Sequence, residues 1–160
     1  DIITTHKMND TNTNVGGWPS TSMRTFVNND IYNALPDEIK NAIIDTTVVS
    51  GHGSTSGETN FTSTDKLYLL TPKEIYTDFS SDNDTAKDLT RTLDYYKAQG
   101  VTTSNYSGAI KKNGTSAAWW WLRAANSGTT RNFYTVGSIG AYDDIYASST
   151  YGVAPAFRLG

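Results

Sequence analysis

Cysteine is absent from the 160 residues, and charged side chains make up only 18% of the chain. Without a thiol there is no cysteine nucleophile, thiolate-bound zinc, iron–sulfur cluster or disulfide. The 13 basic and 16 acidic side chains leave a formal charge of −3, which gives no basic surface for nucleic acid or an anionic membrane. No apolar run approaches the roughly 18 residues that a membrane-spanning helix needs. We therefore expect no nucleic-acid partner and no membrane insertion.

Small neutral polar residues take the place of charge: the chain has 24 Thr, 15 Ser and 13 Asn, beside 13 Gly and 10 Tyr. A chain of this length buries roughly 70% of its unfolded surface, which is enough for one core without disulfides or metals. We expect a single domain over residues 1–160. Because the first residue is Asp1, we interpret the sequence as a mature product or an excised domain.

Helical patterns fall mainly before residue 100. Residues 1–15 are polar and are interpreted as an extended lead-in, in which Ile2 and Ile3 can pair as an edge strand. We expect a first helix capped by Ser20 or Ser22, with an apolar stripe of Met23, Phe26, Val27, Ile31 and Leu35. A second helix is expected after Pro36, with Ile39 and Ile43 facing inward and Ile44 closing it, and a short third one at Lys73–Tyr76, with a Thr71–Glu74 capping box. The last is expected over Thr85–Ala98, capped by Asp84, with Leu89, Leu93 and Tyr96 in one stripe and Gly100 as its left-handed end.

Strand patterns predominate from residue 119 onward. Two earlier strands are expected at Thr46–Val49 and Lys66–Leu70, with a Gly/Ser/Thr loop at Ser50–Thr59 between them. The later strands are expected at Trp119–Arg123, Phe133–Val136 and Val153–Leu159, separated by glycines. Helices first and an antiparallel sheet last indicate an α+β fold with two to three helices and a small twisted sheet joined by long loops.

The run Trp119–Trp120–Trp121 is the most unusual local feature. In a strand, Trp119 and Trp121 share one face and Trp120 takes the other. The structural interpretation is a core anchor, since aromatic rings this large dominate core packing; the functional alternative is a platform on which sugars stack. Arg123, inside the same strand, is expected to be buried or half-buried and to form a bidentate ion pair with a carboxylate from the helical half.

Several ordered blocks carry a resemblance to a known family. They are Gly16–Pro19, Met23–Arg24, Tyr32–Pro36, Asp65–Thr71, Trp119–Ala124 and Gly152–Leu159. Together they resemble the signature of a domain family of unknown function found in surface proteins of gut bacteria and their phages. The closing block is also similar to the last strand of C-type-lectin-like domains of the formylglycine-generating-enzyme type. The resemblance implies a C-type-lectin-like fold and an extracellular location, on a bacterial surface or a phage particle.

Two departures limit what the resemblance implies. Ala154 stands where the family usually has Arg, and the enzymatic branch uses a pair of cysteines that this chain lacks. We therefore expect no enzymatic activity, no catalytic residue and no cofactor. His6 and His52 both lie in polar segments rather than on expected helices or strands, which gives little support for a Ser/His/Asp site.

The region 126–151 is expected to bind the ligand. Tyrosines interleaved with Ser, Asn, Asp and Gly resemble the chemistry of antibody binding loops, and in C-type-lectin-like domains this region carries the ligand surface. Ordinary polar hairpin loops are the alternative. The expected ligand-binding residues are Arg131, Asn132, Tyr134, Ser138, Tyr142, Asp143, Asp144, Tyr146, Ser148, Ser149, Thr150 and Tyr151. The partner is expected to be an unidentified protein or glycan.

Three further hypotheses stay open at the level of sequence. Some C-type-lectin-like domains are variable proteins of diversity-generating retroelements, and the residue types at Tyr142–Tyr146 and Ser148–Tyr151 fit that mutagenesis. A structural spacer without a ligand of its own is the alternative function. A calcium site receives weak support from Asp143 and Asp144, while Asp78, Asp82, Asp84 and Asp88 lack EF-hand spacing; we expect no metal.

Overall fold

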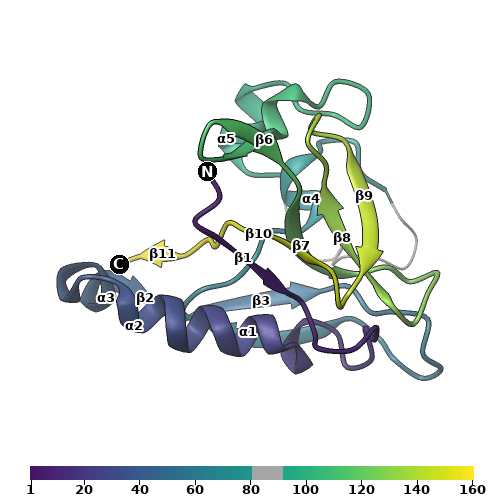
Figure 1. The fold of residues 1–160 in the computed structure, drawn as a ribbon, viewed down its shortest axis with the longest axis horizontal. Helices are drawn as coiled ribbons and strands as arrows, with labels where there is room; N and C mark the ends of the chain where they lie inside the picture. Colours follow the sequence, from purple (N-terminus) through teal and green to yellow (C-terminus); the bar gives the residue numbers. More distant parts are fainter. Residues whose placement is uncertain (81–91) are drawn as a thin grey trace.

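The computed structural model describes residues 1–80 and 92–160 and has a mixed α+β architecture of short helices and small sheets (Figure 1). The expected α+β class is confirmed. Within the described residues no helix combines the length and the apolar character needed to cross a bilayer. One contiguous core joins residues from Ile2 to Ala154, so the two halves of the chain pack together.

The main sheet has five strands in the order β1-β10-β7-β8-β9. Their bounds are Thr4–Lys7 for β1, Thr150–Val153 for β10, Trp120–Ala125 for β7, Asn132–Val136 for β8 and Tyr142–Tyr146 for β9. Figure 1 shows β9 at the outer edge of this sheet. Its neighbour pairs are antiparallel except β10 and β7, which run parallel at Gly152 and Trp120. The expectation of a purely antiparallel sheet is therefore wrong at this one pair.

Gly152 makes the parallel contact possible. A Cβ at this position would lie 2.8 Å from the backbone oxygen of Trp119 and 2.6 Å from Cδ1 of Ile2. Only glycine lets the two strands and the N-terminal segment approach this closely. The lead-in is ordered by the same contacts, since the amide of Ile3 donates to the oxygen of Val153 at 3.0 Å. The segment does form an edge strand, β1, but this strand begins at Thr4, directly after Ile2 and Ile3.

The remaining strands form two-stranded pairs. β3 (Thr46–Ser50) pairs with β4 (Phe61–Asp65), β2 (Ile43–Ile44) with β11 (Arg158–Leu159), and β5 (Lys111–Asn113) with β6 (Ser116–Ala118). β3 confirms the strand expected at Thr46–Val49. The expected strand Lys66–Leu70 is a largely buried extended segment with a single bridge, Tyr68 to Ala156. In the segment Val153–Leu159, expected as one strand, only Val153 (the end of β10) and Arg158–Leu159 (β11) belong to strands, because Pro155 interrupts the pairing.

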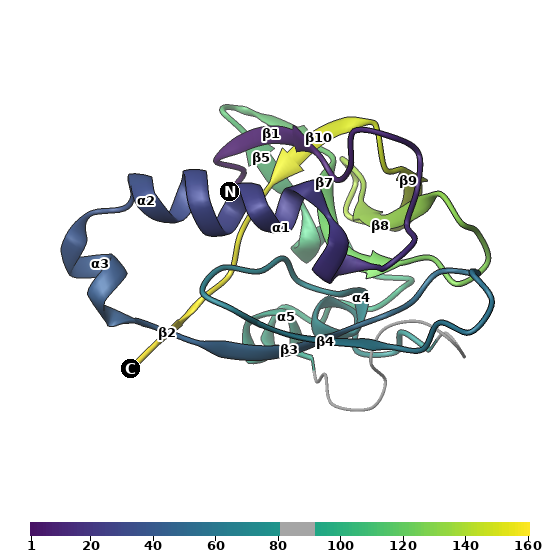
Figure 2. The ribbon, with the colours of Figure 1, turned by 90° about the horizontal axis from the view of Figure 1, so that it is seen from below.

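The first helix runs from Ser22 to Ala34 in three parts: α1 (Ser22–Phe26), a π-helical turn (Val27–Ile31) and α2 (Tyr32–Ala34). Its cap is Thr21, not Ser20 or Ser22, because the Thr21 hydroxyl accepts the amide of Arg24 at 3.0 Å. Met23 and Val27 are fully buried, and the rest of the expected stripe packs against the core. Figure 2 shows this helix between β1 and the β3–β4 pair.

The helix after Pro36 is α3 (Asp37–Ala42), and its expected inner face is only partly right. Ile39 is 39% exposed, whereas Ile43 is buried but lies in β2. The helix stops at Ala42 because the chain turns extended at Ile43 (ψ 121°) to pair with β11. Ile44, which was expected to close the helix, is therefore also a strand residue.

The two later helices are short. α4 (Pro72–Ile75) has the expected capping box between Thr71 and Glu74. α5 (Asp94–Ala98) is terminated by Gly100, which lies two residues after its last turn and has a φ of +66°; the Gly100 N–H donates to Lys97 O and the Val101 N–H to Tyr96 O. Leu93 is extended, so α5 begins at Asp94. The start of the longer expected helix, with Asp84 and Leu89, lies outside the described residues.

Candidate functional site

The hairpin of β8 and β9 brings half of the expected ligand-binding residues together. Asn132 pairs with Tyr146, Tyr134 with Asp144, and Val136 with Tyr142. Side chains of directly paired residues lie on the same face of a sheet. Tyr142 and Tyr146 are 42% and 48% exposed. We call the resulting surface the hairpin face; its exposed or half-exposed members are Arg131, Asn132, Tyr142, Asp144 and Tyr146, and the buried Tyr134 lies beneath them.

An aromatic cluster supports one end of the hairpin face. The Tyr142 ring lies edge-on to Phe79, Tyr76 and Tyr134, with ring centroids 5.2, 5.7 and 6.2 Å away. Edge-on aromatic pairs of this kind add stabilisation beyond their buried area. Tyr134, expected to contact ligand, is only 7% exposed. It therefore supports Tyr142 from below rather than offering a contact surface of its own.

Tyr76 ties the cluster to the turn between β8 and β9. Its hydroxyl donates to the backbone oxygen of Gly140 at 2.6 Å, from a fully buried side chain. Gly140 has a φ of +94°, and a Cβ there would lie 2.1 Å from the oxygen of Tyr106, so only glycine fits. Burial, followed by the nearby hydroxyls of Tyr96 and Tyr142, raises the pKa of Tyr76 well above its ordinary value.

The alkaline stability of the protein should reflect this hydroxyl. Because the folded state raises the pKa of Tyr76, the corresponding stabilisation is full below pH ~10 and is lost as the pH rises further. We expect Tyr76→Phe to lower the free energy of unfolding by about 1–2 kcal/mol at pH 7. The variant should also lose less stability than wild type between pH ~9 and ~11. Urea unfolding across this range measures both effects, and equal pH slopes would contradict the assignment.

Polar pairs frame the other end of the hairpin face. Asn132 Nδ2 donates to Asp144 Oδ2 at 2.7 Å, and the guanidinium of Arg131 lies over the Tyr146 ring at 5.3 Å from its centroid. Both interactions hold exposed or half-exposed side chains in defined positions. Hydrogen-bonding groups beside a half-exposed ring can contact a ligand without rearranging first.

The remaining expected residues lie elsewhere. Ser138 is in the turn before β9, while Ser148 and Ser149 are in the turn after it, at the opposite end of the strand. Ser148 N–H donates to Asn12 Oδ1 at 3.1 Å, so this second turn is joined to the N-terminal segment. Thr150 and Tyr151 begin β10, where Tyr151 pairs with His6. Alternation along β9 directs Asp143 to the side opposite Asp144.

A cavity lies next to the β8–β9 turn. Its volume is about 250 Å³, and we call it the Trp119 cavity. It is lined by Trp119, Gly137, Ser138, Ile139, Ala141, Tyr142 and Asp143. Trp119 is half-buried and Ile139 is 62% exposed, so the cavity has apolar walls open to solvent. Six of its seven lining residues lie in the expected ligand-binding region 126–151, and two of these, Tyr142 and Asp143, begin β9.

Two of the three tryptophans in the run belong to the scaffold. Trp120 and Trp121 are fully buried, and their indole N–H groups donate to the oxygens of Ala109 (3.2 Å) and His6 (2.9 Å). The core-anchor interpretation is confirmed for both. Trp119 differs: its ring lies 5.9 Å from that of Tyr151 and reaches the surface at the Trp119 cavity.

Arg123 is also structural, and its partner is Glu74 of α4. The guanidinium Nη1 lies 2.5 Å from Glu74 Oε1, with 2% of the Arg123 side chain exposed. Nη1 also donates to Leu69 O (2.6 Å) and Nη2 to Val49 O (2.9 Å). The expected buried pair with a carboxylate from the helical half is present. The ion pair is not bidentate, because the other guanidinium nitrogens of Arg123 donate to backbone oxygens.

Asn14 fixes the loop that leads into β8 and was not identified from the sequence. This fully buried amide donates through Nδ2 to Thr129 O and Asn132 O, both at 2.9 Å. A Cβ at Gly53 would lie 2.1 Å from Asn14 Oδ1, so glycine is needed beside it. Nothing local distinguishes Asn14 from its polar neighbours in the lead-in, so the sequence carried no signal for this role.

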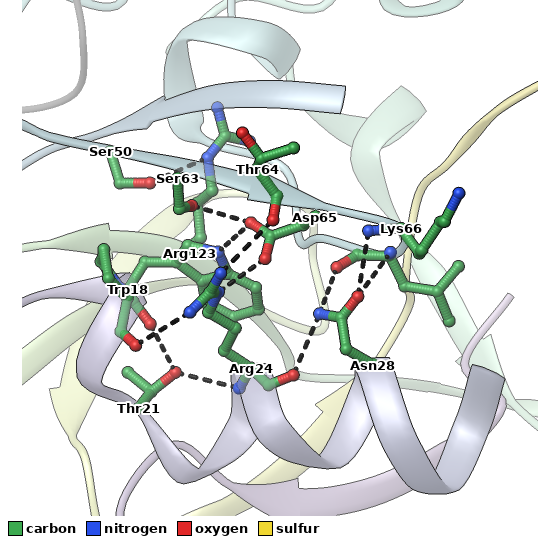
Figure 3. Close-up of polar contacts among 12 residues, drawn as sticks. Trp18, Thr21, Arg24, Asn28, Ser50, Ser63, Thr64, Asp65, Lys66 and Arg123 are labelled. Carbon is green, nitrogen blue, oxygen red and sulfur yellow. Dashed lines mark hydrogen bonds and ion pairs between the residues drawn. The ribbon is translucent and has the colours of Figure 1, made fainter. Parts of the chain in front are cut away.

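A second polar cluster lies between α1 and β4 (Figure 3). The Asp65 carboxylate, only 1% exposed, accepts Arg24 Nε at 2.5 Å, Trp18 Nε1 at 3.1 Å and the Ser63 hydroxyl at 2.8 Å. An open cleft of about 330 Å³ runs beside it, between Arg24, Asn28 and Lys66 among others.

Asn28 completes this cluster. Its Oδ1 accepts the amides of Lys66 and Leu67 at 3.1 and 3.0 Å, and its Nδ2 donates to Leu67 O at 2.8 Å (Figure 3). The blocks Gly16–Pro19, Met23–Arg24 and Asp65–Thr71 therefore meet in space. Because they bond to one another, their role is to hold α1 on the β3–β4 pair, and the hairpin face remains the candidate site.

A family model described as "Domain of unknown function (DUF6273)" matches residues 1–160. The chain belongs to this family, in agreement with the expectation of a domain family of unknown function. Neither the curated proteins nor the solved structures gave a match to this chain.

Proposed function

We propose that this domain is a ligand-binding module without enzymatic activity, and that the hairpin face is its binding surface. The observation that carries the proposal is the arrangement on β8 and β9: half-exposed Tyr142 and Tyr146 stand beside Arg131, Asn132 and Asp144 on paired strands. Tyrosine offers a large contact area with little conformational freedom to lose, and the polar side chains add directional hydrogen bonds.

The rigidity beneath the hairpin face supports the proposal. β8 is paired on both sides, with β7 and β9, and Phe133, Thr135 and Val136 on it are fully buried. The loop before β8 is held by Asn14, and the turn after it by Tyr76. A binding surface fixed in this way loses little entropy when it engages a partner.

A C-type-lectin-like fold is part of the proposal. The pairing of the N-terminal β1 with β10 and the small sheet flanked by short helices support it. With that fold goes an extracellular location, on a bacterial surface or phage particle, and a protein or glycan as ligand. A variable protein of a diversity-generating retroelement would place its variation at Tyr142–Tyr146, on the edge strand β9, and at Ser148–Tyr151, in the turn after β9 and the start of β10.

The proposal is tested by removing the two exposed rings. The double variant Tyr142→Ala/Tyr146→Ala should weaken binding at least about tenfold on a glycan array and on a protein array, because buried aromatic contacts dominate such interfaces. Tyr95→Ala is the matched control, since Tyr95 is 64% exposed on α5 and outside the hairpin face. Thermal unfolding confirms that each variant is folded. Wild-type binding by the folded double variant would disprove the site.

A structural spacer or assembly module is the second candidate, and a second surface favours it. Ile44, Phe157 and Leu159 are 38%, 41% and 61% exposed around the β2–β11 pair. Exposed apolar side chains gathered in this way are typical of contacts with another domain or copy. Sedimentation of the wild-type domain distinguishes the two: self-association without binding on either array would favour the assembly module.

A further inference from the structure

The Trp119 cavity combines an aromatic wall with an exposed carboxylate. Trp119 supplies a ring, Ile139 adds an aliphatic side chain, and Tyr142 lines the cavity where β9 begins. Asp143 lines the same cavity and has an exposed side chain. Its Oδ1 accepts the amide of Asp144 at 2.8 Å, which fixes the orientation of the carboxylate. The volume, about 250 Å³, suits a single side chain of a partner.

We propose that the Trp119 cavity takes a cationic side chain, lysine or arginine, from a protein ligand. A cation is attracted to the face of a Trp ring, and an adjacent carboxylate adds a direct charge partner. This inference rests on the proposed function and names the chemistry of its ligand. A protein is favoured over a neutral glycan because only a cationic group adds an ion pair with the Asp143 carboxylate.

The protein's own cations near the site have other partners. Arg131 lies over the Tyr146 ring, and Lys111 lies over the Trp120 ring at 4.9 Å from its centroid. Among the described residues the ion pairs join Arg24, Lys40, Lys66 and Arg123 to other carboxylates, and none includes Asp143. The net charge of −3 adds a weak overall attraction for a basic partner.

Gly137 leaves space beside the Trp119 ring. A Cβ at this position would lie 3.4 Å from Trp119 Cζ2 and 3.5 Å from the oxygen of Ala141, which is ordinary contact. Any larger side chain would fill the space in front of the indole. The cavity therefore depends on a glycine that backbone conformation alone does not demand, since no positive φ is found there.

The test titrates the ¹⁵N-labelled domain with N-acetyl-lysine methylamide and N-acetyl-arginine methylamide. The neutral counterparts of similar shape are the norleucine and citrulline compounds. The indole N–H signal of Trp119 is the reporter. The indoles of Trp18, Trp120 and Trp121 are internal references, because each donates to a partner inside the protein. We expect saturable shifts of Trp119 with the cations and at least about threefold weaker binding of the neutral compounds.

Asp143→Asn should weaken binding of the cationic compounds about three- to fivefold and leave the neutral ones unchanged. Asp30→Asn is the matched control, since it changes the net charge equally from an exposed position on the first helix. Trp119→Leu, which keeps an apolar wall without an aromatic face, should also weaken cation binding. Equal binding of cationic and neutral compounds, or an unchanged Asp143→Asn variant, would overturn the inference.

Methyl glycosides, titrated in parallel, separate this inference from the proposed function. If glycosides shift the Trp119 and Tyr142 signals and the cations do not, the cavity binds sugar and the cation inference is wrong, while the hairpin face stands. If no compound shifts these signals and the Tyr142→Ala/Tyr146→Ala variant binds both arrays as wild type does, both are wrong.

Discussion

Replacing Arg123 with methionine is expected to lower the free energy of unfolding by about 3–5 kcal/mol. The guanidinium is 2% exposed and joins three parts of the core: Glu74 of α4, the segment at Leu69 and the end of β3 at Val49. Methionine fills similar space but leaves the Glu74 carboxylate and the backbone oxygens of Val49 and Leu69 without this donor. An unpaired buried charge, rather than lost packing, accounts for most of the expected effect.

Urea unfolding followed by tryptophan fluorescence measures this loss. Arg131→Met is the control, since Arg131 is exposed and its replacement should change stability by no more than about 0.5 kcal/mol. Glu74→Gln keeps an oxygen for the capping box while removing the charge. The double variant Arg123→Met/Glu74→Gln should lose less free energy of unfolding than the sum of the two single-variant losses. A loss below about 1 kcal/mol for Arg123→Met would contradict a buried ion pair.

The sequence predicted local features well because their signals lie within a few residues of one another. The capping box joins Thr71 to Glu74, and the end of α5 is set by Gly100 and the turn before it. β3 follows from a run of β-branched residues. Each of these depends on backbone preferences that act before any tertiary contact is made.

Long-range partners could not be predicted. Asn14 bonds to Asn132 across 118 positions, and Arg24 bonds to Asp65 across 41. The helix predicted after Pro36 wrongly included Ile43 and Ile44. The pairing of β2 with β11, at the far end of the chain, ends this helix at Ala42. Hydrophobic spacing alone carries no information about such partners.

The candidate site was predicted in composition but not in geometry. Which tyrosines share a face depends on the register of β8 with β9, which the turn between them fixes. Tyr134 therefore lies beneath Tyr142, while Ser148 and Ser149 fall at the other end of β9. Trp119 became a site residue only because the neighbouring turn leaves its ring half-exposed.

Asp65→Ala is expected to destabilise the fold about as strongly as the change at Arg123, by about 3–5 kcal/mol, and for a related reason. The carboxylate is the shared acceptor for Trp18 Nε1, Arg24 Nε and the Ser63 hydroxyl. Alanine leaves the fully buried Trp18 indole N–H without an acceptor and the Arg24 guanidinium without its charge partner. The contact between α1 and the β3–β4 pair should therefore be the first part of the fold to open.

Asp45→Ala is the matched control for Asp65→Ala. Asp45 pairs with Lys66 on the rim of the same cleft, but 67% of its side chain is exposed, so its loss should change stability by about 0–1 kcal/mol. Denaturant midpoints give both values, and the indole N–H signal of Trp18 reports the local change. Because the Asp65 cluster lies apart from the hairpin face, folded Asp65→Ala at low temperature should bind the arrays as wild type does. Reduced binding by this folded variant would mean that the cleft beside Arg24, and not the hairpin face alone, contacts the ligand.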